Sequence, residues 1–183
     1  MAPSLFPRTS GQSLPGAGSG SVHLRLVRPG ALDLDHVRRL LDTPGWLGAA
    51  VAPEQPGMRR FVTDLVLPLR AGRPRTIFRK AAYVDLGEPS PIDGGLSVAI
   101  GWRSSTLAPL FPVFAGRLEV RRDALVLEGW YAPPGGEAGR ILDRAFLNIA
   151  ARGTARWFLD HVGAVLAAPV GGPAPAPEGL QPR

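Results

Sequence analysis

The segment 138–168 constrains the fold of this 183-residue chain more than any other, because its pattern is typical of one long amphipathic helix. Apolar residues recur near helical spacing, and charged residues occupy the opposite side. The apolar positions are Leu142, Ala145, Phe146, Ile149, Gly153, Trp157, Val162 and Val165. A helix of this length extends about 45 Å. Its apolar side has to be covered by a second layer of structure, which the rest of the chain must supply.

Alternating apolar and polar residues before this helix predict an antiparallel sheet. The predicted strands are 22–28, 59–69, 76–86, 96–103, 112–121 and 124–131, separated by turn sequences rich in Pro and Gly. Two short helices are expected between the first two strands. One runs from the N-cap Asp33 to Asp42, and the other covers 44–52 after the N-cap Thr43. The predicted fold class is therefore α+β, in the order β-α-α-β(5)-α.

The two ends of the chain differ in composition from the middle. Residues 1–20 and 169–183 are rich in Pro, Gly and Ser and carry few large apolar side chains, so both are predicted to be disordered tails. Residues 21–168 are then one folded domain, and 45% apolar content is enough for its core. The chain has no run of about 18 apolar residues, so no membrane span is expected. No secretory signal is recognised at the N-terminus, and a cytoplasmic location is the default expectation.

The charged and reactive residues exclude several functions. The net charge of +6 comes mainly from arginines, with Lys80 as the single lysine, but the arginines are dispersed, so no nucleic-acid partner is expected. Cysteine is absent, which excludes disulfides. The three histidines, His23, His36 and His161, show neither metal-ligand spacing nor a serine or carboxylate placed beside them. The sequence therefore predicts no metal site, no cofactor and no catalytic residue, and it carries no prediction of oligomeric state.

Strand pairing predicts which side chains face the long helix. A two-residue turn at 122–123 pairs Arg121 with Ala124 and, further along the same two strands, Phe114 with Tyr131. The expected result is one apolar wall under the helix, formed by Trp102, Phe114, Leu118, Leu127 and Tyr131, with Phe146 and Ile149 opposite. Glycines on this face, Gly116 and Gly129, either leave open volume or mark bulges that curve the sheet.

Lys80 is weighed separately because its orientation depends on strand register. Pairing Arg70 with Arg75 places Lys80 on the inner face, whereas the alternative register places Arg79 there. An inward lysine suits an anionic ligand group, and the alternative is a lysine at the strand end that reaches water.

Short stretches of the sequence resemble a known superfamily. They are GW at 101–102, LFPV at 110–113, and EGWYAPP at 128–134, which leads into Gly139 and Asp143. Together with the element order, they resemble bacterial members of the START-like, polyketide-cyclase-like superfamily, often called SRPBCC, over residues 22–167. The resemblance implies a helix-grip fold, in which a curved antiparallel sheet of about six or seven strands surrounds a long C-terminal helix. It also implies a cavity for an apolar ligand between the two layers, and it fixes no reaction class.

Three functions follow as hypotheses. The first is binding or carriage of a small hydrophobic or amphipathic ligand, lined by Lys80, Trp102, Phe114, Leu118, Leu127, Tyr131, Phe146 and Ile149. The second is a polyketide cyclase or dehydratase-like enzyme in the same cavity, which would need Tyr131 beside Lys80 or Arg103. The third is a protein interaction module with a filled core, which would use an exposed stripe of Val126, Trp130 and the helix 44–52.

Overall fold

The computed structural model describes residues 21–69, 76–105, 113–132 and 144–168, so the two predicted tails lie outside the described residues. Within these residues, eight antiparallel strands form one sheet, and two helices accompany it. The strands are β1 (Val22–Pro29), β2 (Ala49–Val51), β3 (Met58–Leu69), β4 (Thr76–Gly87), β5 (Ser90–Ile92), β6 (Gly95–Ser104), β7 (Val113–Arg121) and β8 (Ala124–Ala132). The helices are α1 (Leu34–Asp42) and α2 (Arg144–Ala167). The α+β class, the large antiparallel sheet and the C-terminal helix are confirmed.

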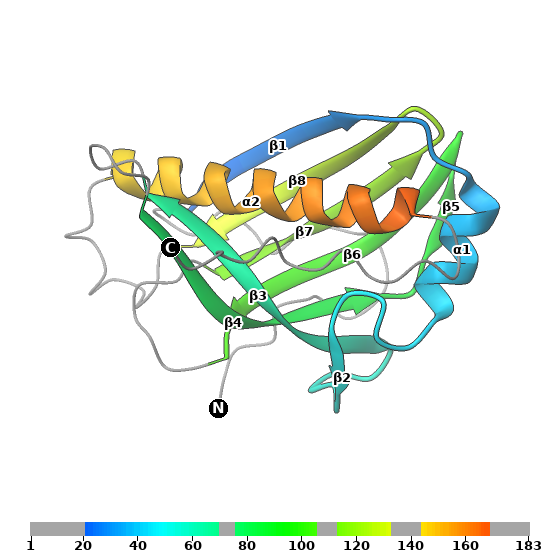
Figure 1. Ribbon diagram of the computed structural model, residues 1–183, viewed down its shortest axis with the longest axis horizontal. Helices are drawn as coiled ribbons and strands as arrows, with labels where there is room; N and C mark the ends of the chain where they lie inside the picture. Colours follow the sequence, from blue (N-terminus) through cyan, green and yellow to red (C-terminus); the bar gives the residue numbers. More distant parts are fainter. Residues whose placement is uncertain (1–20, 70–75, 106–112, 133–143, 169–183) are drawn as a thin grey trace, which may run out of the picture.

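The strands lie in the order β1-β8-β7-β6-β4-β3-β2, with β5 paired to β6. Figure 1 shows α2 lying lengthwise along one side of this sheet, with β1 and β3 on either side of it and α1 near its C-terminal end. Contacts of α2 with β3, β1 and β8 hold it there. The helix covers the apolar face of the strands, and the opposite face of the sheet is called the outer face below.

The strand register agrees with the sequence prediction. Phe114 lies opposite Tyr131, and Trp102 lies opposite Phe114 on the other side of β7. Lys80 is opposite Leu65, as expected from pairing Arg70 with Arg75. The Phe114–Tyr131 register follows from the two-residue turn at 122–123, and a one-residue slip would turn every apolar side chain to the wrong face.

The prediction of a second short helix at 44–52 is wrong. The chain makes turns at 44–47 and then enters β2, which pairs with β3. Gly45 and Gly48 take positive φ angles of 78° and 149°, which a right-handed helix does not contain. A Cβ on Gly48 would collide with the backbone oxygen of Val62 on β3. The two glycines therefore allow a tight path over β3 that a helix would not follow.

The face of α2 that is buried differs from the predicted one. Trp157 is half-buried and stacks on His161, with ring centroids 5.2 Å apart. Phe158 is the aromatic residue that faces the sheet, and it is 1% exposed. Other buried positions in the described part of α2 include Ala151, Thr154, Ala155, Leu159, Val162, Gly163 and Leu166. The predicted first turns at 138–143 lie outside the described residues.

Candidate functional site

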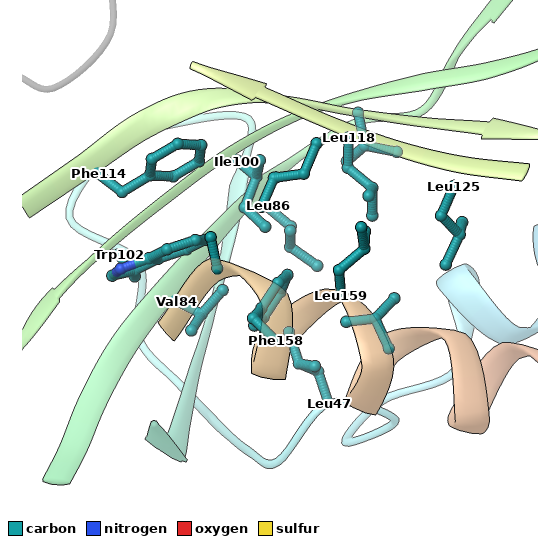
Figure 2. Close-up of a cluster of buried hydrophobic side chains, with 14 of the residues drawn as sticks. Leu47, Val84, Leu86, Ile100, Trp102, Phe114, Leu118, Leu125, Phe158 and Leu159 are labelled. Carbon is teal, nitrogen blue, oxygen red and sulfur yellow. The ribbon is translucent and has the colours of Figure 1, made fainter. Parts of the chain in front are cut away.

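Four aromatic side chains meet in the space between the sheet and α2. Trp102 of β6 stacks on Phe114 of β7, with centroids 4.2 Å apart and planes inclined by 23°. Tyr131 of β8 lies 5.6 Å from the Trp102 ring and 5.0 Å from the Phe114 ring. The ring centroid of Phe158, on α2, lies 5.0 Å from that of Trp102. Figure 2 shows Trp102 and Phe114 on the sheet facing Phe158, with Leu118 further along. All four rings are buried.

Two glycines make room for one of these rings. Gly116 and Gly129 are directly opposite each other on β7 and β8, in a register without a bulge. A Cβ built on either glycine would lie 2.7–2.8 Å from Cζ of Phe114. Neither role considered for these glycines is found as predicted, because the pairing has no bulge and the volume they free is occupied by Phe114.

Three buried polar atoms lie among these apolar groups without a partner. Trp102 Nε1, Tyr131 Oη and Thr154 Oγ1 make no hydrogen bond within the described part of the chain. Thr154 is four residues before Phe158, so it lies one turn away on the same face of α2. Leaving such a group unsatisfied costs about 1–3 kcal/mol. These three atoms are therefore the chemically unusual feature of an otherwise apolar interior.

The phenol of Tyr131 stays protonated in this environment. Burial raises its pKa well above the ordinary value, and the indole N–H of Trp102, which is near the phenol but outside hydrogen-bond geometry, acts in the opposite direction. A protonated phenol both donates and accepts a hydrogen bond, whereas the indole N–H of Trp102 donates only. The interior thus offers polar groups for an uncharged partner.

The predicted site residues are brought together in part. Leu118 and Leu127 are opposite each other and buried in the same core as the three sheet aromatics. Lys80 takes the register position opposite Leu65, and Phe146 and Ile149 belong to α2. The side chains of these last three residues lie outside the described residues. Phe158 and Thr154 were missed, because the apolar spacing of α2 suits either side of Trp157 about equally well.

Tyr131 and Arg103 are not brought together. Tyr131 contacts the inner aromatic rings, whereas Arg103 lies on the outer face and pairs with Glu54. The other partner considered for an enzymatic reaction, Lys80, belongs to β4, and its side chain lies outside the described residues. No second ionisable side chain is seen next to Tyr131 in the described interior.

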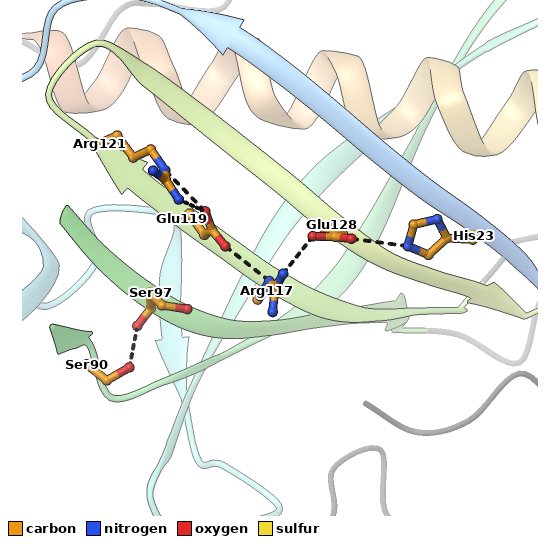
Figure 3. Close-up of polar contacts among 7 residues, drawn as sticks. All are labelled: His23, Ser90, Ser97, Arg117, Glu119, Arg121 and Glu128. Carbon is orange, nitrogen blue, oxygen red and sulfur yellow. Dashed lines mark hydrogen bonds and ion pairs between the residues drawn. The ribbon is translucent and has the colours of Figure 1, made fainter. Parts of the chain in front are cut away.

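The outer face carries polar networks instead. Figure 3 shows Glu128 of β8 between Arg117 of β7 and His23 of β1. Arg117 Nη2 donates to Glu128 at 2.8 Å, and His23 Nε2 is 3.4 Å from the same carboxylate. Arg117 and Arg121 both pair with Glu119. These contacts tie β1, β8 and β7 together on the side facing away from α2.

The prediction of an exposed apolar stripe, made for an interaction module, is wrong at Val126 and Trp130. Val126 is 4% exposed, and Trp130 is half-buried with its ring 4.8 Å from that of His23. Trp46, expected on a short helix, is half-buried with its ring 6.2 Å from that of Phe61. Their indole rings lie against neighbouring rings because turns and cross-strand pairs bring them there.

Comparison with protein-family models, with curated proteins and with solved structures finds no match for this chain. The described residues contain no group of three His, Asp or Glu side chains placed to hold a metal ion. None of the described helices is long and apolar enough to cross a membrane. Function has to be inferred from the residues and their geometry.

Proposed function

We propose that this chain binds a small hydrophobic or amphipathic ligand between the sheet and α2, in a helix-grip arrangement. The strand order, with β1 beside β8 and α2 lying along the sheet, supports that arrangement. The aromatic side chains of Trp102, Phe114 and Phe158 support an apolar occupant.

The observation that carries the proposal is the set of three unpartnered polar atoms on Trp102, Tyr131 and Thr154. Natural proteins pair most buried polar groups, so three orphans in one interior need a reason. A ligand with a carbonyl or hydroxyl group would accept from the indole N–H and exchange a hydrogen bond with either hydroxyl. Its apolar body would contact the surrounding rings. The ligand is therefore expected to be uncharged at the buried end and mostly apolar.

Native mass spectrometry of the purified full chain tests this proposal. We expect a discrete small-molecule adduct that dissociates when the protein is unfolded. A neutral aromatic fluorophore, N-phenyl-1-naphthylamine, serves as a probe in parallel, and it is expected to bind saturably and to compete with the adduct.

A matched pair of variants locates the binding. Tyr131→Phe removes only the inner hydroxyl and is expected to weaken adduct or probe binding about tenfold, the effect of one hydrogen bond worth about 1.4 kcal/mol. Tyr83→Phe removes a hydroxyl on the outer face and is expected to leave binding unchanged. An unliganded spectrum together with no saturable probe binding would show that side chains alone fill the interior.

A further inference from the structure

A second polar site lies on the outer face of the sheet, across β3, β4 and β6. Arg60 is directly opposite Asp85, and Tyr83 is directly opposite Arg103. Phe61, Val84 and Trp102, which adjoin these residues along the strands, belong to the buried core, so the four side chains point away from α2. Arg60 and Asp85 are nevertheless only 6% exposed. Their burial therefore does not come from α2, which lies on the other face of the sheet.

One nitrogen of each arginine pairs with the same carboxylate oxygen of Glu54. Arg60 uses Nε and Nη2 to donate to Asp85, at 2.6 and 2.8 Å. Its remaining nitrogen, Nη1, is 2.7 Å from Glu54 Oε1. Arg103 Nη2 pairs with the same Glu54 oxygen, and the buried Arg103 Nε has no partner within the described residues. Asp85 neutralises Arg60, so the second positive charge is balanced by Glu54.

Glu54 differs from the other three members because it does not belong to the sheet. It lies in the loop 52–57 between β2 and β3, and its side chain is 54% exposed. The loop also contains Gly57, whose φ is 75°. Arg60 and Arg103 are only 6% and 21% exposed, so Glu54 is the member of these ion pairs that is open to solvent. Glu54 is therefore the accessible partner of two arginines that belong to the sheet.

The aromatic ring of Tyr83 fixes the positions of the arginines. The Arg60 guanidinium carbon is 5.1 Å from the ring centroid, and that of Arg103 is 5.9 Å away. Cation–π contacts of this kind keep guanidinium groups in place without using their N–H donors. The hydrogen bond from Arg60 lowers the pKa of Glu54, so an ionised carboxylate occupies the position between the arginines.

We propose that this position is a binding site for the carboxylate or phosphate group of a small molecule, and that Glu54 occupies it in the free protein. Two guanidinium groups with converging N–H donors are the usual protein partners of such oxyanions. An incoming anion would replace Glu54 on Arg60 Nη1 and Arg103 Nη2 and would supply an acceptor for Arg103 Nε. The loop 52–57 would move aside with its carboxylate. The site is separate from the interior and does not depend on the proposed function.

Amide NMR titrations at constant ionic strength test this site, with sodium acetate and sodium phosphate replacing chloride in separate series. Wild-type protein is expected to show saturable shifts at residues around Tyr83 and Arg103. The Glu54→Gln variant is expected to bind the better probe about tenfold more tightly, the gain expected if the displaced state is populated at about one tenth. The two series also decide between the two anions, because the better probe identifies the group that the site prefers.

Matched variants separate this site from general charge effects. Glu88→Gln removes the same charge at an exposed position after β4 and is expected to leave affinity unchanged. Arg103→Gln in the Glu54→Gln background is expected to abolish binding. Glu54→Ala serves as a second variant, and circular dichroism checks that each variant is folded. The proposal is overturned if Glu54→Gln binds neither anion saturably, or if the added Arg103→Gln change leaves the affinity intact.

Discussion

The guanidinium of Arg60 and the carboxylate of Asp85 form a doubly hydrogen-bonded ion pair across β3 and β4. The two bonds measure 2.6 and 2.8 Å, and each side chain is 6% exposed. Asp85 is the main reason that the pKa of Arg60 is raised. A charge buried this deeply depends on its partner, because neither group is solvated by water.

The Asp85→Asn variant tests that dependence. Removing one charge of a buried pair costs about 3–5 kcal/mol, and Glu54 still balances part of the charge on Arg60, so a loss of about 3 kcal/mol in unfolding free energy is expected. Urea denaturation measures it. The double variant Arg60→Leu with Asp85→Leu is expected to lose less than the single variant, because no unpaired charge stays buried. A larger loss in the double variant would contradict this account.

Two glycine substitutions are expected to differ greatly in their effect on stability. Gly129→Ala would place a methyl group 2.7 Å from the backbone of Gly116 and from the Phe114 ring, and it is expected to cost about 3 kcal/mol. For Gly163→Ala, the three atoms nearest to the new methyl group all belong to the guanidinium of Arg28, which is 30% exposed and able to move. Its loss of the Arg28–Asp160 ion pair is offset by the better helix propensity of alanine, so its net change is expected to stay within about 0.5 kcal/mol.

Thermal unfolding of both glycine variants, followed by circular dichroism, provides the comparison. Equal losses of stability in the two variants would mean that the Gly116–Gly129 contact is looser than the distances indicate.

Replacing Thr154 by Val is expected to stabilise the ligand-free protein. The Thr154 hydroxyl is buried without a partner, so its removal is expected to raise the unfolding free energy by about 1 kcal/mol. Thr43→Val is the contrasting change, because the Thr43 hydroxyl donates to the Arg39 carbonyl at 2.9 Å. That variant is expected to lose about 0.5–1 kcal/mol. Denaturation of ligand-stripped protein measures both, and a destabilised Thr154→Val would show that its hydroxyl has a partner.

The ionisation of Tyr131 is expected to be suppressed until the protein unfolds. In a Tyr83→Phe variant it is the only tyrosine, so absorbance near 295 nm reports it alone. The pKa of Tyr131 is raised by burial in the folded state, whereas the unfolded chain ionises near pH 10. Above that pH the unfolded state binds fewer protons, so stability falls as pH rises. The absorbance change is expected to coincide with the loss of folded structure. Ionisation of Tyr131 while the protein is still folded would contradict this prediction.

Much of the sheet followed from the sequence. The short turn at 122–123 and the alternation of apolar residues were enough to pair Phe114 with Tyr131 and Leu118 with Leu127. Near Lys80 the same reasoning left two registers open, and the structure has the one that places Lys80 opposite Leu65. Local turn length and side-chain alternation determine register without reference to the rest of the molecule, which explains why these predictions are confirmed.

Contacts between distant segments could not be predicted in the same way. The pattern of α2 allowed Trp157 to face the sheet, yet Phe158 does so. Gly48 was expected in a helix, but its close approach to Val62 on β3 requires a turn. Arg103 was considered as a partner of Tyr131, and it instead meets Glu54 from a loop far away in the sequence.

By itself, the sequence determined the α+β class, the register of β7 with β8 and the apolar wall that includes Trp102, Phe114 and Tyr131, because these depend on spacing along one strand or across one turn. Only the tertiary structure decided which side of α2 covers that wall, and therefore that Thr154 is buried beside Phe158 without a partner. It also decided that Glu54 lies between two arginines. The physical reason is that helix rotation and loop path depend on packing against the whole sheet, which local periodicity does not encode.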